Sequence, residues 1–267
     1  MIKKLIKNAA KQLGYEIILK KKSHYKHTDQ EQRDEAEAMI RMVRKNHTTM
    51  VADLGLLTLY RQALFCEKAR IEGAFVECGV WKGGAVGMMA QVNLAHGKAR
   101  RDIHLFDAFE EICEPDETID GERAVEEVKK YAINGGTKGR MIALRGIYDR
   151  RGGPGTIEDN KKLLTGDIGY DPEYLHFHKG WFQDTLPKQH STIDEIAILR
   201  IDADWYASTK ICLDYLFDKV VSGGFVIIDD YGAYEGCRKA VDEFLDSIGE
   251  PLFLHYVNED IRYIFKP

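Results

Sequence analysis

Apolar and polar positions change their spacing along the chain near residue 74. Before it, apolar residues recur every three or four positions, as on one face of a helix. After it, short apolar runs alternate with helical stretches, which predicts a mainly parallel β-sheet covered by helices on both faces. The predicted strands are Ala74–Cys78, Ile103–Phe106, Tyr174–His178, Glu195–Ile201 and Phe225–Ile228. The predicted helices occupy residues 84–96, 121–132, 157–164, 207–220 and 237–247.

The end of the chain predicts a reversal of strand direction. Leu252–Val257 and Ile261–Phe265 are two β-rich runs separated only by Asn258-Glu-Asp260. A turn this short joins antiparallel strands. Parallel strands finished by a reversed hairpin strand predict a doubly wound α/β fold of the class I methyltransferase type. A dinucleotide dehydrogenase would more often continue with parallel crossovers.

The first 47 residues lie outside the alternating pattern and are predicted to form an N-terminal helical extension to a main domain at 48–267. Within residues 2–13, apolar positions at helical spacing are surrounded by lysines. Such a helix would either lie on a membrane surface or pack on the body or on a partner subunit. Packing is favoured because the apolar stripe is short. Residues 111–156 are rich in glycine and arginine and predict a lid-like insertion in the main domain.

Composition narrows the class of protein. The formal net charge of -5 argues against a general nucleic-acid binder, which would present a basic surface. The five cysteines are scattered without a CxxC pair, which favours reduced thiols. No apolar run approaches the length of a membrane span, and the start of the chain lacks the apolar core of a signal peptide. A cytoplasmic protein is expected.

The first predicted strand runs into a glycine-rich turn that begins at Glu77. Gly79 permits a tight turn, while Gly83 and Gly84 allow a ligand close to the start of the next helix. A helix N-terminus attracts a carboxylate, and Glu77 would pair with an ammonium group. The turn therefore suits the methionine part of S-adenosylmethionine. The alternative is a glycine turn used only for packing.

The next two strands also end in residues suited to a nucleoside. Asp107 follows the second strand, where a carboxylate can accept hydrogen bonds from both ribose hydroxyls. Trp181 and Phe182 follow the third strand and would hold an adenine between their rings. The alternative for the two aromatic residues is ordinary packing under a loop.

Four carboxylates, those of Asp202, Asp204, Asp229 and Asp230, follow the fourth and fifth strands. Neighbouring carboxylates repel one another, and a hard divalent cation relieves that repulsion. Ligands that are all oxygen suit Mg²⁺ or Mn²⁺. We assign Asp202, Asp229 and Asp230 to the metal and Asp204 to the general base. The alternative is that these residues are helix N-caps and ion-pair partners.

These groups together predict methyl transfer to a hydroxyl. A hydroxyl is a poor nucleophile at neutral pH, and a bound cation lowers its pKa while a carboxylate takes its proton. The methyl group of a sulfonium is already activated. The remaining requirement is to hold oxygen, carbon and sulfur in line.

At these residues the chain resembles the macrocin O-methyltransferase family, which methylates sugar hydroxyls on macrolides and related glycosides. The resemblance covers roughly residues 48–247. The motifs that carry it are Phe75–Gly84, Tyr170–Pro172, Lys179–Pro187, Ile198–Asp204, Gly223–Gly232 and Ala240–Phe244. The resemblance implies a sugar or glycoside acceptor and a homo-oligomer.

The resemblance also implies magnesium dependence, with Asp202, Asp229 and Asp230 matching the family's metal carboxylates. Asp204 matches a proposed base in some members, whereas other members use a histidine near this site. The family's usual Asp-Gly-Asp is Asp-Ala-Asp at residues 202–204. The 111–156 segment is unlike that of the macrolide enzymes, which leaves the acceptor open.

Arginines in the 111–156 segment suggest one class of acceptor. Arg140, Arg145, Arg150 and Arg151 would meet a phosphate, as in a nucleotide-sugar or a polysaccharide precursor. The alternative is a solvated basic loop.

Two other functions fit parts of the sequence. Asp202-Ala-Asp204 imitates the metal-binding DxD of a glycosyltransferase, but that function leaves the Glu77 turn and the Asp229-Asp230 pair unexplained. A catalytically silent subunit would not need the carboxylates. A methyltransferase acting on a non-sugar hydroxyl also remains an alternative.

Overall fold

The computed structural model describes residues 25–45, 47–249 and 251–267. The basic stretch at residues 2–13 lies outside the described residues. The chain divides into two compact units, residues 1–37 and 38–267, and helix α2 (Tyr25–Arg44) crosses the division. Among the described helices, none combines the length and the apolar character needed to cross a membrane.

One sheet organises the second unit. Its described strands follow the order β3-β2-β1-β4-β5-β7-β6. Strands β1 to β5 run parallel, and β7 is antiparallel to both β5 and β6. The predicted fold class, a mainly parallel sheet with a reversed C-terminal strand, is therefore confirmed. The strands are β1 (Ala74–Cys78), β2 (Ile103–Asp107), β3 (Leu175–Lys179), β4 (Ile196–Ile201), β5 (Val220–Ile228), β6 (Leu254–Tyr256) and β7 (Arg262–Phe265).

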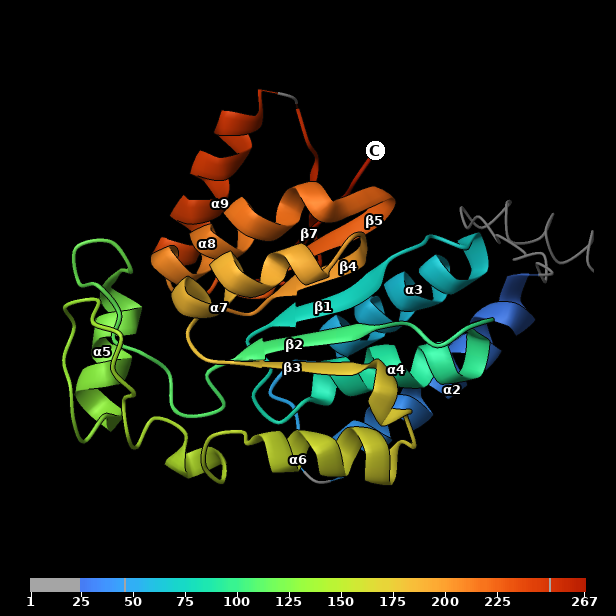
Figure 1. The fold of residues 1–267 in the computed structure, drawn as a ribbon, viewed down its shortest axis with the longest axis horizontal. Coiled ribbons are helices and arrows are strands. Elements are labelled where there is room, and N and C mark those ends of the chain that lie inside the picture. The colour runs from blue at the N-terminus through green and yellow to red at the C-terminus, as the bar shows by residue number, and fades with distance from the viewer. Residues whose placement is uncertain (1–24, 46, 250) are drawn as a thin grey trace, which may run out of the picture. The chain divides into compact units, whose positions relative to one another are not determined.

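Helices cover both faces of this sheet (Figure 1). Helices α3 and α4 pack together on one face, and α7, α8 and α9 lie on the other. All five predicted helices are present, and α7 is an addition that the sequence pattern did not predict. The helices are α3 (Asp53–Ala69), α4 (Gly84–His96), α5 (Glu122–Tyr131), α6 (Ile157–Lys161), α7 (Phe182–Gln189), α8 (Tyr206–Leu216) and α9 (Glu235–Ile248).

The central strands explain why the sheet was visible in the sequence. Every residue of β1 and of β4 is buried, as expected for parallel strands covered on both faces. Val76 and Leu199 lie in the core on these strands, and Phe106 joins them from β2. Arg200 is the charged exception in β4, and it is 2% exposed. The sheet therefore places one buried cation near its carboxyl edge.

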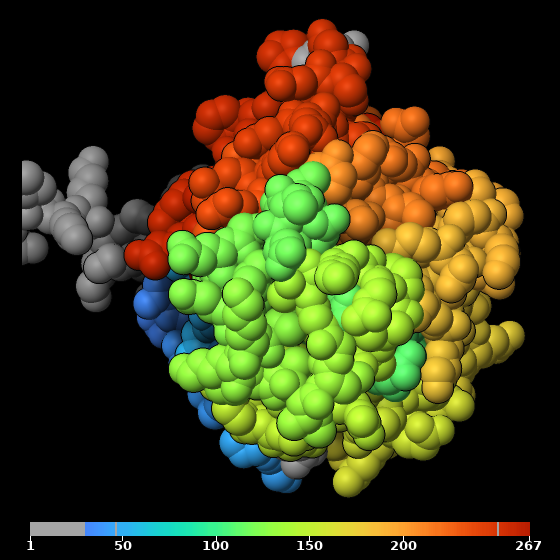
Figure 2. All heavy atoms as spheres, turned by 90° about the vertical axis from the view of Figure 1, so that its left-hand side faces the viewer, coloured from blue at the N-terminus to red at the C-terminus, as the bar shows by residue number. Residues whose placement is uncertain are grey.

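Residues 111–156 lie beyond the carboxyl ends of the strands and cover that end of the second unit (Figure 2). Side chains of the body hold the backbone of this segment. Trp205 Nε1 donates to Cys113 O at 3.0 Å, and Lys82 Nζ donates to Gly152 O at 2.9 Å. Trp81 Nε1 donates to Gly153 O at 3.2 Å. The 111–156 segment is thus attached on two sides of the sheet edge.

Histidines form a stack where β2 meets β3. The ring of His104 stacks on those of His176 and His178, and His104 Nδ1 lies 3.0 Å from His178 Nε2. Burial lowers the pKa of His104 to about 3 and that of His178 to about 4. His176 instead contacts Asp102 at 2.7 Å. Two neutral imidazoles are therefore part of the folded sheet.

Acidification is expected to weaken the fold through this stack. The pKa values of His104 and His178 in the folded state lie below the usual 6.5. At pH values between the folded and the unfolded pKa, the unfolded chain therefore binds more protons than the folded chain. The stabilisation is complete above about pH 6.5 and is lost as the pH falls toward 4. Between pH 6.5 and 5, urea unfolding should show wild type losing about 2 kcal/mol more than His104→Phe. Parallel pH profiles for the two proteins would contradict this assignment.

Candidate active site

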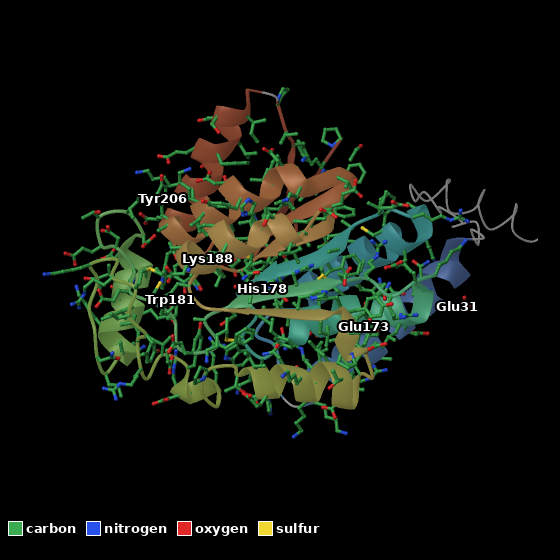
Figure 3. The ribbon with its side chains drawn as sticks, in the orientation of Figure 1. Glu31, Glu173, His178, Trp181, Lys188 and Tyr206 are labelled. Atoms are coloured by element: carbon green, nitrogen blue, oxygen red, sulfur yellow. The ribbon has the colours of Figure 1, made fainter. Side chains whose placement is uncertain are left out.

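A cavity of about 400 Å³ lies at the carboxyl edge of the sheet. Trp181, at the point where β3 leads into α7, lies at this end beside the 111–156 segment (Figure 3). The cavity brings together all the predicted site residues except Gly83. They are Glu77, Gly79, Gly84, Asp107, Trp181, Phe182, Asp202, Asp204, Asp229 and Asp230.

The turn after β1 needs glycine because other backbone comes close to it. Gly79 has a φ of +86°, and a Cβ there would lie 1.7 Å from the carbonyl oxygen of Asp202. The amide of Gly84 donates to Thr48 O at 2.9 Å. A Cβ on Gly83 would lie 2.3 Å from Asn160 Oδ1, so Gly83 faces α6. Gly79 thus allows the ends of β1 and β4 to approach each other.

Substitution of Gly79 should destabilise the fold far more than substitution of a glycine that has free space around its Cα. Gly79→Ala combines a left-handed backbone with a clash against backbone, so we expect a loss of about 2–5 kcal/mol in the free energy of unfolding. Gly166→Ala is the matched control, because a Cβ there meets nothing within 4 Å. Its effect should stay within about 1 kcal/mol. Urea unfolding of both variants tests this, and equal losses would contradict it.

Asp107 holds the glycine turn in place. Its Oδ2 accepts hydrogen bonds from the amides of Val80 at 2.6 Å and Trp81 at 3.0 Å. Its Oδ1 accepts from the amide of Phe109 at 2.6 Å. Burial raises the pKa of Asp107, and these backbone donors oppose the rise. The carboxylate therefore supports the turn while it lines the cavity.

A buried ion-pair cluster forms the floor of the cavity. Arg200 Nη1 contacts Glu77 Oε1 and lies 2.9 Å from Asp202 Oδ2. Arg200 Nη2 lies 2.5 Å from Asp229 Oδ1. Burial raises the pKa of Glu77 to about 8 and that of Asp229 to about 6, and Arg200 opposes both rises. Glu77 Oε2 is buried without a hydrogen-bond partner among the described residues.

Three carboxylates gather beside this cluster. One oxygen from each of Asp202, Asp204 and Asp230 lies within 4.8 Å of the others. The amide of Asp204 donates to Asp230 Oδ2 at 3.2 Å, and Asp204 has a φ of +56°. Asp229 is directed to Arg200 and is not in this group. Sequence pattern had separated Asp204 from the metal ligands, whereas the folded chain places its carboxylate next to two of them.

The charges of this group suit a cation. Burial, and then the charge of Asp202, raise the pKa of Asp204 well above its usual range. Burial, and then the charge of Asp204, do the same for Asp230. A divalent cation beside this group would relieve both penalties, and carboxylate oxygens are the ligands that Mg²⁺ or Mn²⁺ prefers. The residues present therefore fit the predicted metal.

Part of the cavity wall beside the glycine turn comes from the 111–156 segment, whose Tyr148 ring lies next to that of Trp81. Tyr148 and Arg151 line the cavity. Arg140 is instead paired with Glu114 at 2.6 Å, and the Arg150 guanidinium lies 3.5 Å from the centre of the Tyr131 ring. Arg151 is thus the member of the predicted arginine group that lines the cavity.

Sequence reasoning missed several lining residues. Arg200 had a signal, because it is a charged residue within an apolar strand. The others are ordinary polar or aromatic residues whose place depends on how the 111–156 segment folds back and on the loop after β5. They are Arg123, Glu127, Tyr148 and Tyr234.

The arrangement of strands and site is that of a class I methyltransferase. The solved structure of the O-methyltransferase NovP matches with a TM-score of 0.68 and 26% identity, over 88% of this chain and 99% of that chain. The calicheamicin methyltransferase CalS11 shares the fold, with a TM-score of 0.54 and 19% identity over 87% of this chain and 92% of that chain.

The chain belongs to the Macrocin-O-methyltransferase (TylF) family, whose profile matches residues 4–134 and 165–259. It is similar to 8-demethyl-8-(2,3-dimethoxy-alpha-L-rhamnosyl)-tetracenomycin-C 4'-O-methyltransferase of Streptomyces olivaceus, with 33% identity over 67% of this chain and 60% of that relative. Demethyldecarbamoylnovobiocin O-methyltransferase of Streptomyces niveus is 36% identical over 65% of this chain and 58% of that relative. The matches thus span about three fifths of these relatives. The family is one of methyltransferases, which removes the basis for the glycosyltransferase alternative.

Proposed function

We propose that this protein is an S-adenosylmethionine-dependent and divalent-metal-dependent O-methyltransferase whose acceptor is a sugar hydroxyl. The observation that carries the proposal is the placement of the Asp202, Asp204 and Asp230 carboxylates beside a buried glutamate that has one oxygen free. The first group suits a cation and the second suits an ammonium, and both line the same cavity. Family membership supports the reaction type.

The cofactor would lie against the turn after β1. Glu77 Oε2 would accept the ammonium, because it is the oxygen that Arg200 leaves free. Gly79, Gly84 and Asp107 line the same cavity. Asp107 Oδ1 accepts one amide hydrogen bond and keeps capacity for a ribose hydroxyl. Trp181 and Phe182 would bracket the adenine.

We assign Asp202, Asp229 and Asp230 to the metal and Asp204 to the base. Asp229 uses Oδ1 for Arg200, which leaves Oδ2 for the ion. A bound divalent cation would polarise the acceptor hydroxyl and lower its pKa. Asp204 would take the proton from this hydroxyl. Its position beside Asp202 and Asp230 supports this role, because it lies next to the assigned metal ligands.

A sugar acceptor is favoured by the relatives. The two relatives quoted above are named for methylation of a rhamnosyl-bearing tetracenomycin and of demethyldecarbamoylnovobiocin. The family profile leaves residues 135–164 unmatched, and part of the cavity wall comes from that stretch. We therefore expect a sugar hydroxyl on a scaffold that differs from those of the relatives. A non-sugar hydroxyl is the competing outcome of the acceptor test.

Calorimetric titration with S-adenosylhomocysteine, with and without Mg²⁺, tests the proposal first. Binding of S-adenosylhomocysteine and of Mg²⁺ by the wild-type protein is expected. Methyl transfer from S-adenosylmethionine to methyl glycosides, nucleotide-sugars and catechols then tests the acceptor class. Transfer to catechols alone would refute the sugar assignment, and absence of S-adenosylhomocysteine binding would refute the methyltransferase assignment.

A further inference from the structure

Arg200 connects two sides of the cavity floor. It lies on the central strand β4 and is the register neighbour of Glu77 on β1. Asp202 is the first residue after the end of β4, and Asp229 is the first residue after the end of β5. Its side chain is 2% exposed, and the ion pairs to Glu77, Asp202 and Asp229 all use this one guanidinium.

Each of the three carboxylates gives one oxygen to Arg200. The second oxygen of Glu77 has no hydrogen-bond partner among the described residues, and all three carboxylates line the cavity. A guanidinium offers its donors in a rigid planar fork, so it cannot move closer to one carboxylate without changing its contact with the others. The Arg200 guanidinium and the Glu77 carboxylate are 2% and 1% exposed, so solvent screens their charges poorly. A change at one carboxylate should therefore alter the ion pairs of Arg200 with the other two.

We propose that Arg200 is a positioning residue that couples the cofactor side of the cavity, at Glu77, to the metal side, at Asp202 and Asp229. The inference rests on the proposed function, which supplies the two ligands. When a carboxylate on one side no longer pairs with Arg200, the guanidinium pairs more fully with the other side. There it competes with the incoming ammonium or metal cation. Because the coupling is a shared free energy, it acts in both directions.

The first test asks whether a cofactor-side change reaches the metal. Mg²⁺ is titrated calorimetrically into wild type, Glu77→Gln and Glu127→Gln, without any cofactor. Both substitutions replace a cavity-lining carboxyl group with an amide, but Glu127 contacts the Tyr234 hydroxyl and not Arg200. We expect Glu77→Gln to weaken Mg²⁺ binding roughly 5- to 10-fold and Glu127→Gln to weaken it less than about 2-fold.

The second test runs in the opposite direction. S-adenosylhomocysteine is titrated into Asp202→Asn and Asp230→Asn with EDTA present. Both residues belong to the acidic group, but only Asp202 contacts Arg200. We expect Asp202→Asn to weaken binding roughly 5- to 10-fold and Asp230→Asn to change it less than about 2-fold. All four variants keep Arg200 paired with at least two carboxylates, and circular dichroism checks their fold.

The outcomes separate the coupling from the function. Unequal effects within both pairs, in the stated direction, support the coupling. Equal effects within either pair overturn it and leave the proposed function standing, provided that wild type binds both ligands. Failure of wild type to bind S-adenosylhomocysteine overturns the proposed function and the coupling with it.

Discussion

Asp204→Asn is expected to lower kcat by about 10²- to 10⁴-fold, the usual contribution of a positioned general base. The asparagine keeps the shape of the side chain but cannot take a proton from the acceptor. Because Asp204 is assigned as the base and not as a metal ligand, Mg²⁺ affinity should fall by no more than about 10–100-fold, the usual cost of losing a group outside the ligands, and high Mg²⁺ should not restore kcat. Rates are measured with an acceptor that wild type methylates, at saturating S-adenosylmethionine and Mg²⁺.

The position of Asp204 makes this experiment informative. Its carboxylate shares the group with Asp202 and Asp230, so a ligand role is the competing assignment. Loss of Mg²⁺ affinity in Asp204→Asn, with kcat restored at high Mg²⁺, would show that Asp204 is a ligand. An unchanged kcat would show that the base lies elsewhere.

Asp230→Asn should weaken Mg²⁺ binding more than about 100-fold, since loss of a supporting partner outside the ligands already costs about 10–100-fold. Asp230 is 9% exposed and lies in the acidic group, and sequence and geometry both assign it to the metal. Calorimetric titration with Mg²⁺ measures the effect. Tyr206→Phe is a control, because Tyr206 bonds Glu243 on an exposed surface. Comparable Mg²⁺ affinities for the two variants would contradict the assignment.

The sheet could be predicted because its central strands are buried on both faces. Ala74–Cys78 was predicted with the boundaries that the structure has, and Ile196–Ile201 differs by one residue at its start. The hairpin followed from the short turn between two β-rich runs. Helix α7 was missed because it contains Pro187 and because Trp181 and Phe182 were considered only as partners of an adenine or as packing under a loop. A proline there weakens the helical pattern, and tertiary packing overrides it.

The site was predictable to the extent that it is built from strand ends. Parallel strands share one carboxyl edge, so residues that follow them meet even when far apart in sequence. The contacts between these residues were not predictable. Asp107 looked like a ribose ligand, yet it accepts three backbone amides of the neighbouring turns. Arg200 lies beside Glu77 because of the register between β1 and β4. The spacing of apolar residues in the sequence does not reveal this register.

The attachment of the 111–156 segment bears on how such an enzyme acquires new acceptors. Trp81, Lys82 and Trp205 donate hydrogen bonds to carbonyl oxygens of that segment, and the Trp81 ring also contacts that of Tyr148. Carbonyl oxygens persist whatever side chain a mutation introduces. Cavity-lining side chains that take no part in these contacts, such as that of Arg151, are therefore free to diverge while the wall that carries them stays in place. Directed evolution of acceptor range should accordingly start from these positions and leave the three anchoring residues unchanged.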